Sequence, residues 1–134
     1  EGHIAALRDY GDALGIAFQM VDDLLDYSGT EAMGKTLGDD FRERKMSLPL
    51  IRAVAASDAD ERAFWQRTIG KGQQDDGDLD HALAIMAQHG VLESTRNTAL
   101  DWAARAKAAL DGLPEDPLRG MLADLADYVV ARIS

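Results

Sequence analysis

The chain has 134 residues, of which 46% are hydrophobic and 6% aromatic, and its formal net charge is −10 at pH 7. This length is enough for one hydrophobic core and short for two ordinary domains. The negative charge argues against binding of nucleic acid, which requires a clustered basic surface. The chain has no cysteine, which excludes disulfides and thiolate metal sites and suits a cytoplasmic protein. No apolar run approaches the roughly 20 residues of a membrane-spanning helix.

Apolar residues recur at helical spacing along the chain, and Gly, Pro and Asp mark the breaks between these segments. No segment shows strand alternation flanked by hairpin turns. The sequence therefore predicts an all-α fold, a helical bundle of about five to six helices in a single region over residues 1–134. The expected helices are Gly2–Tyr27, a helix after Ser47, Ala59–Ile69, a helix from Asp76 or Asp78 to His89, Val91–Leu110, and Pro117 to about Ile133, with an irregular stretch over Thr30–Met46.

Polar residues with capping chemistry precede three of these helices. Ser47 can cap a helix whose first turn holds Pro49. Asp58, with Glu61 three residues later, has the pattern of a capping box. Asp116 is placed to cap the last helix.

The first expected helix carries an apolar face at spacings of three, four and seven residues. The members of this face are Leu7, Leu14, Phe18, Val21 and Leu25. We expect this face to pack into the core. Trp65 and Trp102 lie in other amphipathic helices, and we expect them in the core or at an interface.

The same helix ends in carboxylates, within the segment "AFQMVDDLLD". Residues four apart lie on one side of a helix, so Asp22 and Asp26 share a stripe with Gln19, while Asp23 points aside. Carboxylates at this spacing repel each other, and they lie at the helix end that the dipole makes unfavourable for them. Such violations of local rules tend to mark functional sites, and a hard divalent cation such as Mg²⁺ would relieve both. The alternative is a solvated acidic turn beside the core.

Basic residues follow these carboxylates in the segment "GKTLGDDFRERK". A loop that contains glycines would allow Lys35 to fold back over the helix end, where its ammonium group could bind phosphate as a point charge. Carboxylates, Mg²⁺ and lysines together describe a diphosphate site. The alternative, that Lys35 and Lys45 only neutralise the aspartates, stays open.

The segments "GIAFQMVDDLLD", "GKTLGDD", "RK" and "SLPLI" together resemble the second aspartate-rich region of trans-isoprenyl diphosphate synthases, and the long-chain octaprenyl, solanesyl and decaprenyl branch is the most similar. The resemblance implies the isoprenoid synthase fold, of which this chain would be the C-terminal portion. It also implies a prenyltransferase of isoprenoid biosynthesis, such as that of the ubiquinone side chain. Such an enzyme extends an allylic prenyl diphosphate with isopentenyl diphosphate and uses Mg²⁺ as its cofactor.

The resemblance also implies roles for the acidic residues. Asp22 would be the direct magnesium ligand, and it would take part in catalysis. Asp26 and Asp40 would support the metal through waters. Asp23 would complete the acidic motif.

For the substrate, the resemblance implies that Lys35 and Lys45 bind the allylic diphosphate and contribute to catalysis. Phe18 and Gln19 would line the pocket for the allyl group. One departure concerns Arg44, since many relatives have glycine at this position. This substitution bears on the local shape of the backbone.

The resemblance covers the whole chain but less than half of the family fold. The chain opens in the middle of a helical pattern without Met, so we expect a fragment that is inactive alone, with the family's first aspartate-rich motif upstream of it. The parent enzyme is expected to be a cytoplasmic homo-oligomer, a dimer. The rival hypothesis is a non-catalytic helical interaction module or regulatory subunit whose acidic face is solvated.

Overall fold

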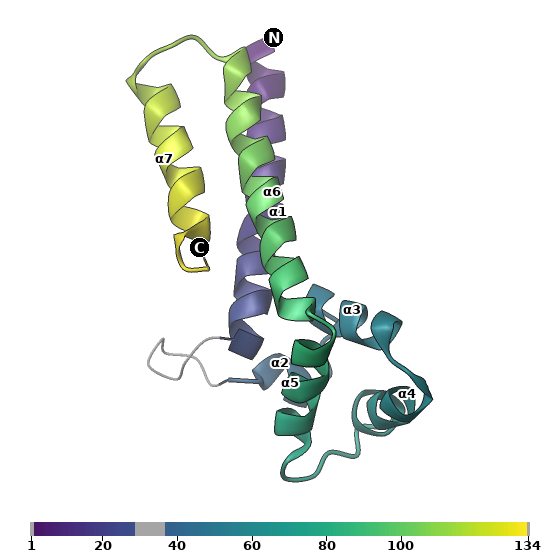
Figure 1. Cartoon of the computed structure of the whole chain (residues 1–134). Helices are drawn as coiled ribbons and strands as arrows, with labels where there is room; N and C mark the ends of the chain where they lie inside the picture. Colours follow the sequence, from purple (N-terminus) through teal and green to yellow (C-terminus); the bar gives the residue numbers. More distant parts are fainter. Residues whose placement is uncertain (1, 29–36, 134) are drawn as a thin grey trace. The chain divides into compact units, whose positions relative to one another are not determined.

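The computed structural model describes residues 2–28 and 37–133, and within these ranges it contains seven α-helices and no strand (Figure 1). The all-α prediction is confirmed. Six helices follow the predicted segments, and the additional helix α2 is a short turn within the stretch that was expected to be irregular. The α-helices are α1 (Gly2–Ser28), α2 (Asp39–Arg42), α3 (Leu48–Ala56), α4 (Ala59–Trp65), α5 (Asp78–Gln88), α6 (Val91–Ala109) and α7 (Pro117–Ala131).

The helices form two compact units. The first unit comprises residues 1–22 and 96–134, and the second comprises residues 23–95. Helices α1 and α6 are each divided between the two units, with one end in the first unit and the other end in the second. Helix α7 belongs to the first unit, and α2 to α5 belong to the second. None of the helices in the described ranges combines the length and the apolar character needed to cross a bilayer.

Two of the three predicted caps are confirmed. The Asp58 side chain accepts a hydrogen bond from the Glu61 amide at 2.9 Å, and the Glu61 side chain accepts one from the Asp58 amide at 2.9 Å. The Asp116 side chain accepts from the Arg119 amide at 3.2 Å. Ser47 does occupy the N-cap position of α3, but its side chain makes no capping hydrogen bond. Helix α3 therefore starts without the side-chain cap that was expected.

The first unit packs α1 against α6 and α7 through small residues (Figure 1). Its buried cluster consists of Tyr10, Ala13, Ala106, Leu110 and Ala126. The Tyr10 hydroxyl donates to the carbonyl of Leu122 at 2.7 Å and so joins α1 to α7. Small side chains at a helix contact allow a short distance between the helix axes.

The predicted apolar face of α1 is confirmed at Val21, which is buried, and at Leu14, which packs partly buried against the cluster of the first unit, but it is wrong at Leu7 and Phe18. Leu7 is 44% exposed and Phe18 is 58% exposed. The buried residues of this part of α1 are Ala6, Tyr10, Ala13, Ala17 and Val21. Most of them lie one residue before the predicted positions. Spacing identifies a helix, but it does not show that a neighbouring face of alanines is the one on which other helices pack.

Aromatic residues form much of the core of the second unit. Phe41 of α2 stacks on Phe64 of α4 with ring centroids 6.4 Å apart, and Trp65 meets Phe64 edge to face at 5.0 Å. The Trp65 indole donates to the Ser57 hydroxyl at 2.9 Å. Trp65 is thus a core residue, as expected, and Trp102 packs half-buried against the cluster of the first unit.

Candidate functional site

The acidic end of α1 begins the candidate site, and its buried member is Asp26. The Asp26 side chain is fully buried. Its Oδ2 atom accepts a hydrogen bond from the Asp40 amide at 2.9 Å, and its carbonyl accepts one from the Gly38 amide at 2.8 Å. A carboxylate in this position accepts a hydrogen bond from a buried backbone amide that water could not reach. Asp26 therefore holds the start of α2 against the end of α1.

The position before α2 requires glycine. Gly38 has φ of 82°, in the left-handed region that side chains rarely adopt. A Cβ atom at this position would lie 2.5 Å from a methyl carbon of Leu79. Backbone conformation and close packing together disfavour a larger residue, which explains the glycine of the segment "GDD".

Helix α2 ends in a turn that directs the next residues back toward α1. Arg44 has φ of 61°, and it is the only non-glycine residue in the described ranges with a positive φ. The Arg44 amide donates to the Phe41 carbonyl at 3.1 Å, and the Lys45 amide donates to the Asp40 carbonyl at 2.8 Å. These two bonds form a Schellman motif, whose left-handed position is usually glycine. The conformation costs a residue with a side chain roughly 1–2 kcal/mol.

This turn brings Lys45 to the acidic residues of α1. The Lys45 ammonium lies 3.3 Å from Oδ1 of Asp23, and the Lys45 side chain is 46% exposed while that of Asp23 is 9% exposed. The geometry is that of the alternative in which Lys45 neutralises a carboxylate. Binding of a diphosphate by Lys45 would require the lysine to leave Asp23, and it stays a prediction.

Tyr27 reports on the electrostatics of this cluster. Burial raises the pKa of the Tyr27 phenol well above its ordinary value of 10.0, and the carboxylates of Asp26, Asp40 and Asp23 raise it further. A phenolate beside three carboxylates would be strongly disfavoured. The phenol therefore stays neutral, and the cluster concentrates negative charge at the end of α1.

Three of the predicted site residues lie on the part of α1 that belongs to the first unit. Phe18 is exposed, Gln19 is exposed, and Asp22 is half-buried. Phe18 lies at an apolar groove between α1 and α7, and Gln19 is not part of its lining. The groove has a volume of about 440 Å³ and is lined by Gly11, Leu14, Gly15, Phe18, Leu125, Tyr128 and Val129.

The predicted phosphate-binding residue Lys35 lies outside the described residues. Within the described ranges, no three His, Cys, Asp or Glu side chains form a group that could hold a metal ion by themselves. The second unit does bring four predicted residues together, namely Asp23, Asp26, Asp40 and Lys45. Four of the predicted site residues therefore lie together in the second unit, and their roles stay predictions.

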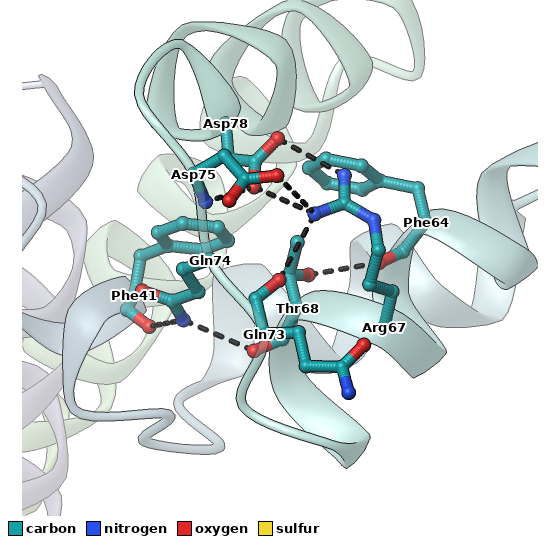
Figure 2. A network of polar contacts seen from close by, with 8 residues as sticks. All are labelled: Phe41, Phe64, Arg67, Thr68, Gln73, Gln74, Asp75 and Asp78. Atoms are coloured by element: carbon teal, nitrogen blue, oxygen red, sulfur yellow. Dashed lines mark hydrogen bonds and ion pairs between the residues drawn. The ribbon is translucent and has the colours of Figure 1, made fainter.

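A second polar network of the second unit was not predicted from the sequence (Figure 2). It is centred on Arg67, which lies in the π-helix that continues α4 over Gln66–Gly70. The Arg67 guanidinium donates to both carboxylate oxygens of Asp78, at 2.9 and 3.0 Å, and to the carbonyl of Gln73 at 2.9 Å. These bonds close the loop before α5. No spacing rule links these residues, because a loop separates them.

The same loop is bonded to α2 through Gln74. Its side-chain amide donates to the carbonyl of Phe41 at 2.9 Å and to the carbonyl of Thr68 at 3.1 Å (Figure 2). The hydrogen bonds from Arg67, followed by the bond from the Asp75 amide, hold the pKa of Asp78 below its ordinary value of 3.8. The loop thus supports the helix that contains Asp40.

The Polyprenyl synthetase family model matches residues 1–86 of the chain. This match covers more than half of the chain. The chain therefore belongs to the polyprenyl synthetase family.

Individual relatives agree with this assignment. The octaprenyl diphosphate synthase of Haemophilus influenzae is 41% identical over 133 residues, which are 98% of this chain and 40% of that protein. A decaprenyl diphosphate synthase from Rhodobacter capsulatus, solved by crystallography, is 61% identical with a TM-score of 0.94, and the match covers 100% of this chain and 42% of that one.

A polyprenyl synthase from Caulobacter crescentus was crystallised in complex with calcium and isoprenyl diphosphate. It is 46% identical with a TM-score of 0.88, and the match covers 97% of this chain and 40% of that one. The present chain thus spans about two fifths of the length of the curated relatives that it matches.

Proposed function

We propose that this chain is the C-terminal part of a trans-polyprenyl diphosphate synthase, which extends an allylic diphosphate with isopentenyl diphosphate to a long-chain product. The observation that carries this proposal is the buried hydrogen bond from the Asp40 amide to the Asp26 carboxylate, at 2.9 Å. This bond joins the two acidic segments of the motif. Similarity to octaprenyl and decaprenyl diphosphate synthases over nearly the whole chain supports the same conclusion.

The carboxylates at the end of α1 have the chemistry that a hard divalent cation requires. Mg²⁺ prefers oxygen ligands, and it is often bound by one or two carboxylates together with waters and substrate phosphate oxygens. A site of this kind does not need three carboxylates from this chain. The calcium and isoprenyl diphosphate in the Caulobacter crescentus structure support a divalent cation and a diphosphate here. We therefore propose Mg²⁺ as the cofactor.

Among the acidic residues, we assign the role of direct ligand to Asp22. Asp26 is fully buried, and one of its oxygens is occupied by the Asp40 amide, so it would fix the end of α1 and the start of α2 and support the metal only through waters. Asp23 is paired with Lys45, and it would hold that lysine in place until substrate binds. Asp40 would support the metal through water.

The proposed chemistry is the ionisation of an allylic diphosphate. A bound metal ion supplies stabilisation of the negative charge that develops on the leaving diphosphate. Lys45, whose side chain is 46% exposed, would exchange Asp23 for a phosphate oxygen, and Lys35 would bind the same group. These residues would hold the diphosphate so that, as its bond to the allyl group breaks, the negative charge on the leaving diphosphate lies next to the lysines and the metal ion.

We propose that Phe18 and Gln19 contact the allyl group. The exposed ring of Phe18 at an apolar groove supports this role, because an apolar groove suits an isoprenoid chain. The isopentenyl diphosphate site and the opposing acidic motif would belong to the rest of the parent enzyme, a homodimer, and the chain alone would be inactive.

The rival proposal is a non-catalytic helical module. The ion pair between Lys45 and Asp23 favours it, because in that geometry the Asp23 carboxylate is already neutralised without a ligand. The two proposals differ in whether Mg²⁺ and a diphosphate bind at the end of α1.

The test uses the full-length protein that contains this chain, with farnesyl diphosphate, radiolabelled isopentenyl diphosphate and Mg²⁺. Asp22→Ala should lower kcat by about 10²–10³-fold, the loss typical when one group that stabilises transition-state charge is removed. Circular dichroism should show unchanged helix content, because Asp22 is only half-buried. Asp12→Ala, at an exposed position of the same helix, is the matched control and should keep full turnover. Near-normal turnover of Asp22→Ala would contradict the assignment, and an inactive wild-type enzyme would favour the helical module.

A further inference from the structure

Arg44 combines an unfavourable backbone with an ordered side chain. Its φ of 61° belongs to the region in which glycine is preferred. A residue with a side chain persists in such a conformation when the surrounding structure fixes it, and these residues often occur at functional sites. The contacts of the side chain therefore need an explanation.

The Arg44 guanidinium binds the end of the π-helix that follows α4. Its Nε atom donates to the carbonyl of Ile69 at 2.7 Å, and its Nη2 atom donates to the carbonyl of Gly70 at 3.0 Å. A Cβ atom on Gly72 would lie 3.0 Å from Nη1 of Arg44, so the guanidinium also packs closely on this loop. A charged donor bonded to two carbonyl groups is a strong anchor.

This anchor lies next to the residue that is proposed to bind phosphate. Within the Schellman turn, the Arg44 amide bonds to Phe41 and the Lys45 amide bonds to Asp40. Consecutive side chains therefore leave the turn toward different elements, Arg44 toward the π-helix and Lys45 toward Asp23 of α1. The bonds that hold the Arg44 side chain also hold the backbone of the turn, and this restricts the direction in which the Lys45 side chain leaves it.

We propose that Arg44 is a positioning residue, which holds the turn after α2 so that Lys45 points toward the acidic end of α1. The proposal rests on the proposed function, since it gives Lys45 a diphosphate to bind. The competing explanation is that the Arg44 side chain only compensates for its own backbone conformation. A positioning role predicts that glycine at this position raises the KM for the allylic diphosphate, and a compensating role predicts that KM stays unchanged.

Arg44→Gly in the full-length enzyme separates them, because glycine suits the backbone and removes the guanidinium. If Arg44 positions Lys45, the KM for the allylic diphosphate should rise by about tenfold with a smaller change in kcat, as expected when hydrogen bonds from a charged group that support substrate binding are lost. Arg44→Lys, which keeps the charge but cannot bond both carbonyls in the same way, should restore KM in part. Arg62→Ala, which removes an exposed arginine of α4, is the control and should keep the wild-type KM. A wild-type KM in Arg44→Gly would overturn the proposal.

A double-mutant cycle tests whether the effect passes through Lys45. In a Lys45→Ala background, Arg44→Gly should raise KM no further, because the group that it positions is gone. An undiminished tenfold effect in that background would overturn the positioning role.

Amide hydrogen exchange gives a readout that does not depend on activity. In Arg44→Gly, exchange should accelerate at the Lys45 amide, which is bonded to Asp40 in the wild-type turn, and it should stay unchanged in α5. Unchanged exchange at Lys45 beside an active wild-type enzyme would overturn the positioning role alone. An inactive wild-type enzyme would instead overturn the proposed function, and with it the phosphate-binding role of Lys45.

Discussion

The two units of the chain bury different kinds of side chain. All eight buried polar or charged residues in the described ranges belong to the second unit, and these are Asp23, Asp26, Asp40, Ser47, Ser57, Thr68, Asp78 and Thr95. Of the eleven buried hydrophobic residues of the first unit, seven are alanines, against two of eleven in the second. The alanines of the first unit are Ala6, Ala13, Ala17, Ala99, Ala103, Ala106 and Ala126.

This difference separates two ways of building a helical structure. In the first unit, small side chains let long helices approach closely. In the second unit, large aromatic side chains fill the core, and buried carboxylates satisfy backbone donors of loops and short helices. Within the described ranges, buried polar groups are thus a feature of the second unit.

The largest effect should come from truncating the core of the second unit. Leu50 is fully buried, and Leu50→Ala should lower the free energy of unfolding by about 2–5 kcal/mol, because it leaves a cavity among large side chains. Denaturant unfolding of the full-length protein measures this change. The control is Ile51→Ala, since Ile51 is 46% exposed and should cost much less. Equal costs at both positions would contradict the described core.

The first unit should instead be sensitive to enlargement. Ala106 is fully buried against Tyr10 and its neighbours, so Ala106→Leu should cost about 1–3 kcal/mol through overpacking. Ala108→Leu, at an exposed position of the same helix, should change stability by less than about 0.5 kcal/mol. A neutral Ala106→Leu would show that the helices of this unit are not in close contact there.

The next effect concerns the buried polar groups of the second unit. Asp26→Ala should lower the free energy of unfolding by about 1–3 kcal/mol, because the buried Asp40 amide loses its acceptor. Asp26→Asn should recover most of this stability, since an amide oxygen can accept the same hydrogen bond. Thermal unfolding followed by circular dichroism compares the two variants. If both are as stable as the wild type, the bond does not hold α2.

The smallest effect should be a pH dependence from Asp78. Its pKa is lowered in the folded state, chiefly by hydrogen bonds from Arg67, so its stabilising contribution is present above the unfolded-state pKa and is lost as the pH falls through the folded-state pKa. Asp78→Asn should therefore be less stable than the wild type near neutral pH, and the two should converge in acid. Unfolding measured from about pH 6 to about pH 2 tests this. The control is Asp80→Asn, at an exposed position of α5, which should follow the wild type throughout.

Local chemistry made the helix boundaries predictable from the sequence. The capping box of Asp58 and Glu61 and the cap at Asp116 depend only on residues within one turn. The packing face of α1 was not predictable in this way, because an apolar face with Leu7 and Phe18 and an alanine face with Ala17 have the same spacing. Which of them is buried depends on the helices that pack against them.

In the candidate site, too, local patterns were predictable from the sequence and long-range contacts were not. Helix spacing and motif resemblance predicted Asp22, Asp26 and Lys45 as site residues from two neighbouring segments of the sequence, and their roles stay predictions. The bonds of Arg44 to Ile69 and Gly70 span 25 and 26 residues, and they depend on how the chain returns after α4. Sequence reasoning found Arg44 only as a departure from the family pattern, and its contact could not be read from the chain alone.

The π-helix over Gln66–Gly70 makes this part of the chain sensitive to the insertion or deletion of a single residue. The Lys71 amide bonds to the Gln66 carbonyl five residues earlier, at 2.8 Å, so this turn holds one residue more than an α-helical turn. A relative that lacks one residue here would return to a regular helix and rotate the subsequent residues by about 100°, which would turn the carbonyls of Ile69 and Gly70 away from Arg44. Insertions and deletions are usually tolerated in loops, but here a change of one residue inside a helix would detach the turn that leads to Lys45. Among relatives that also have arginine at the position of Arg44, the chain length between Phe64 and Asp78 would then indicate which ones keep its bonds to this turn.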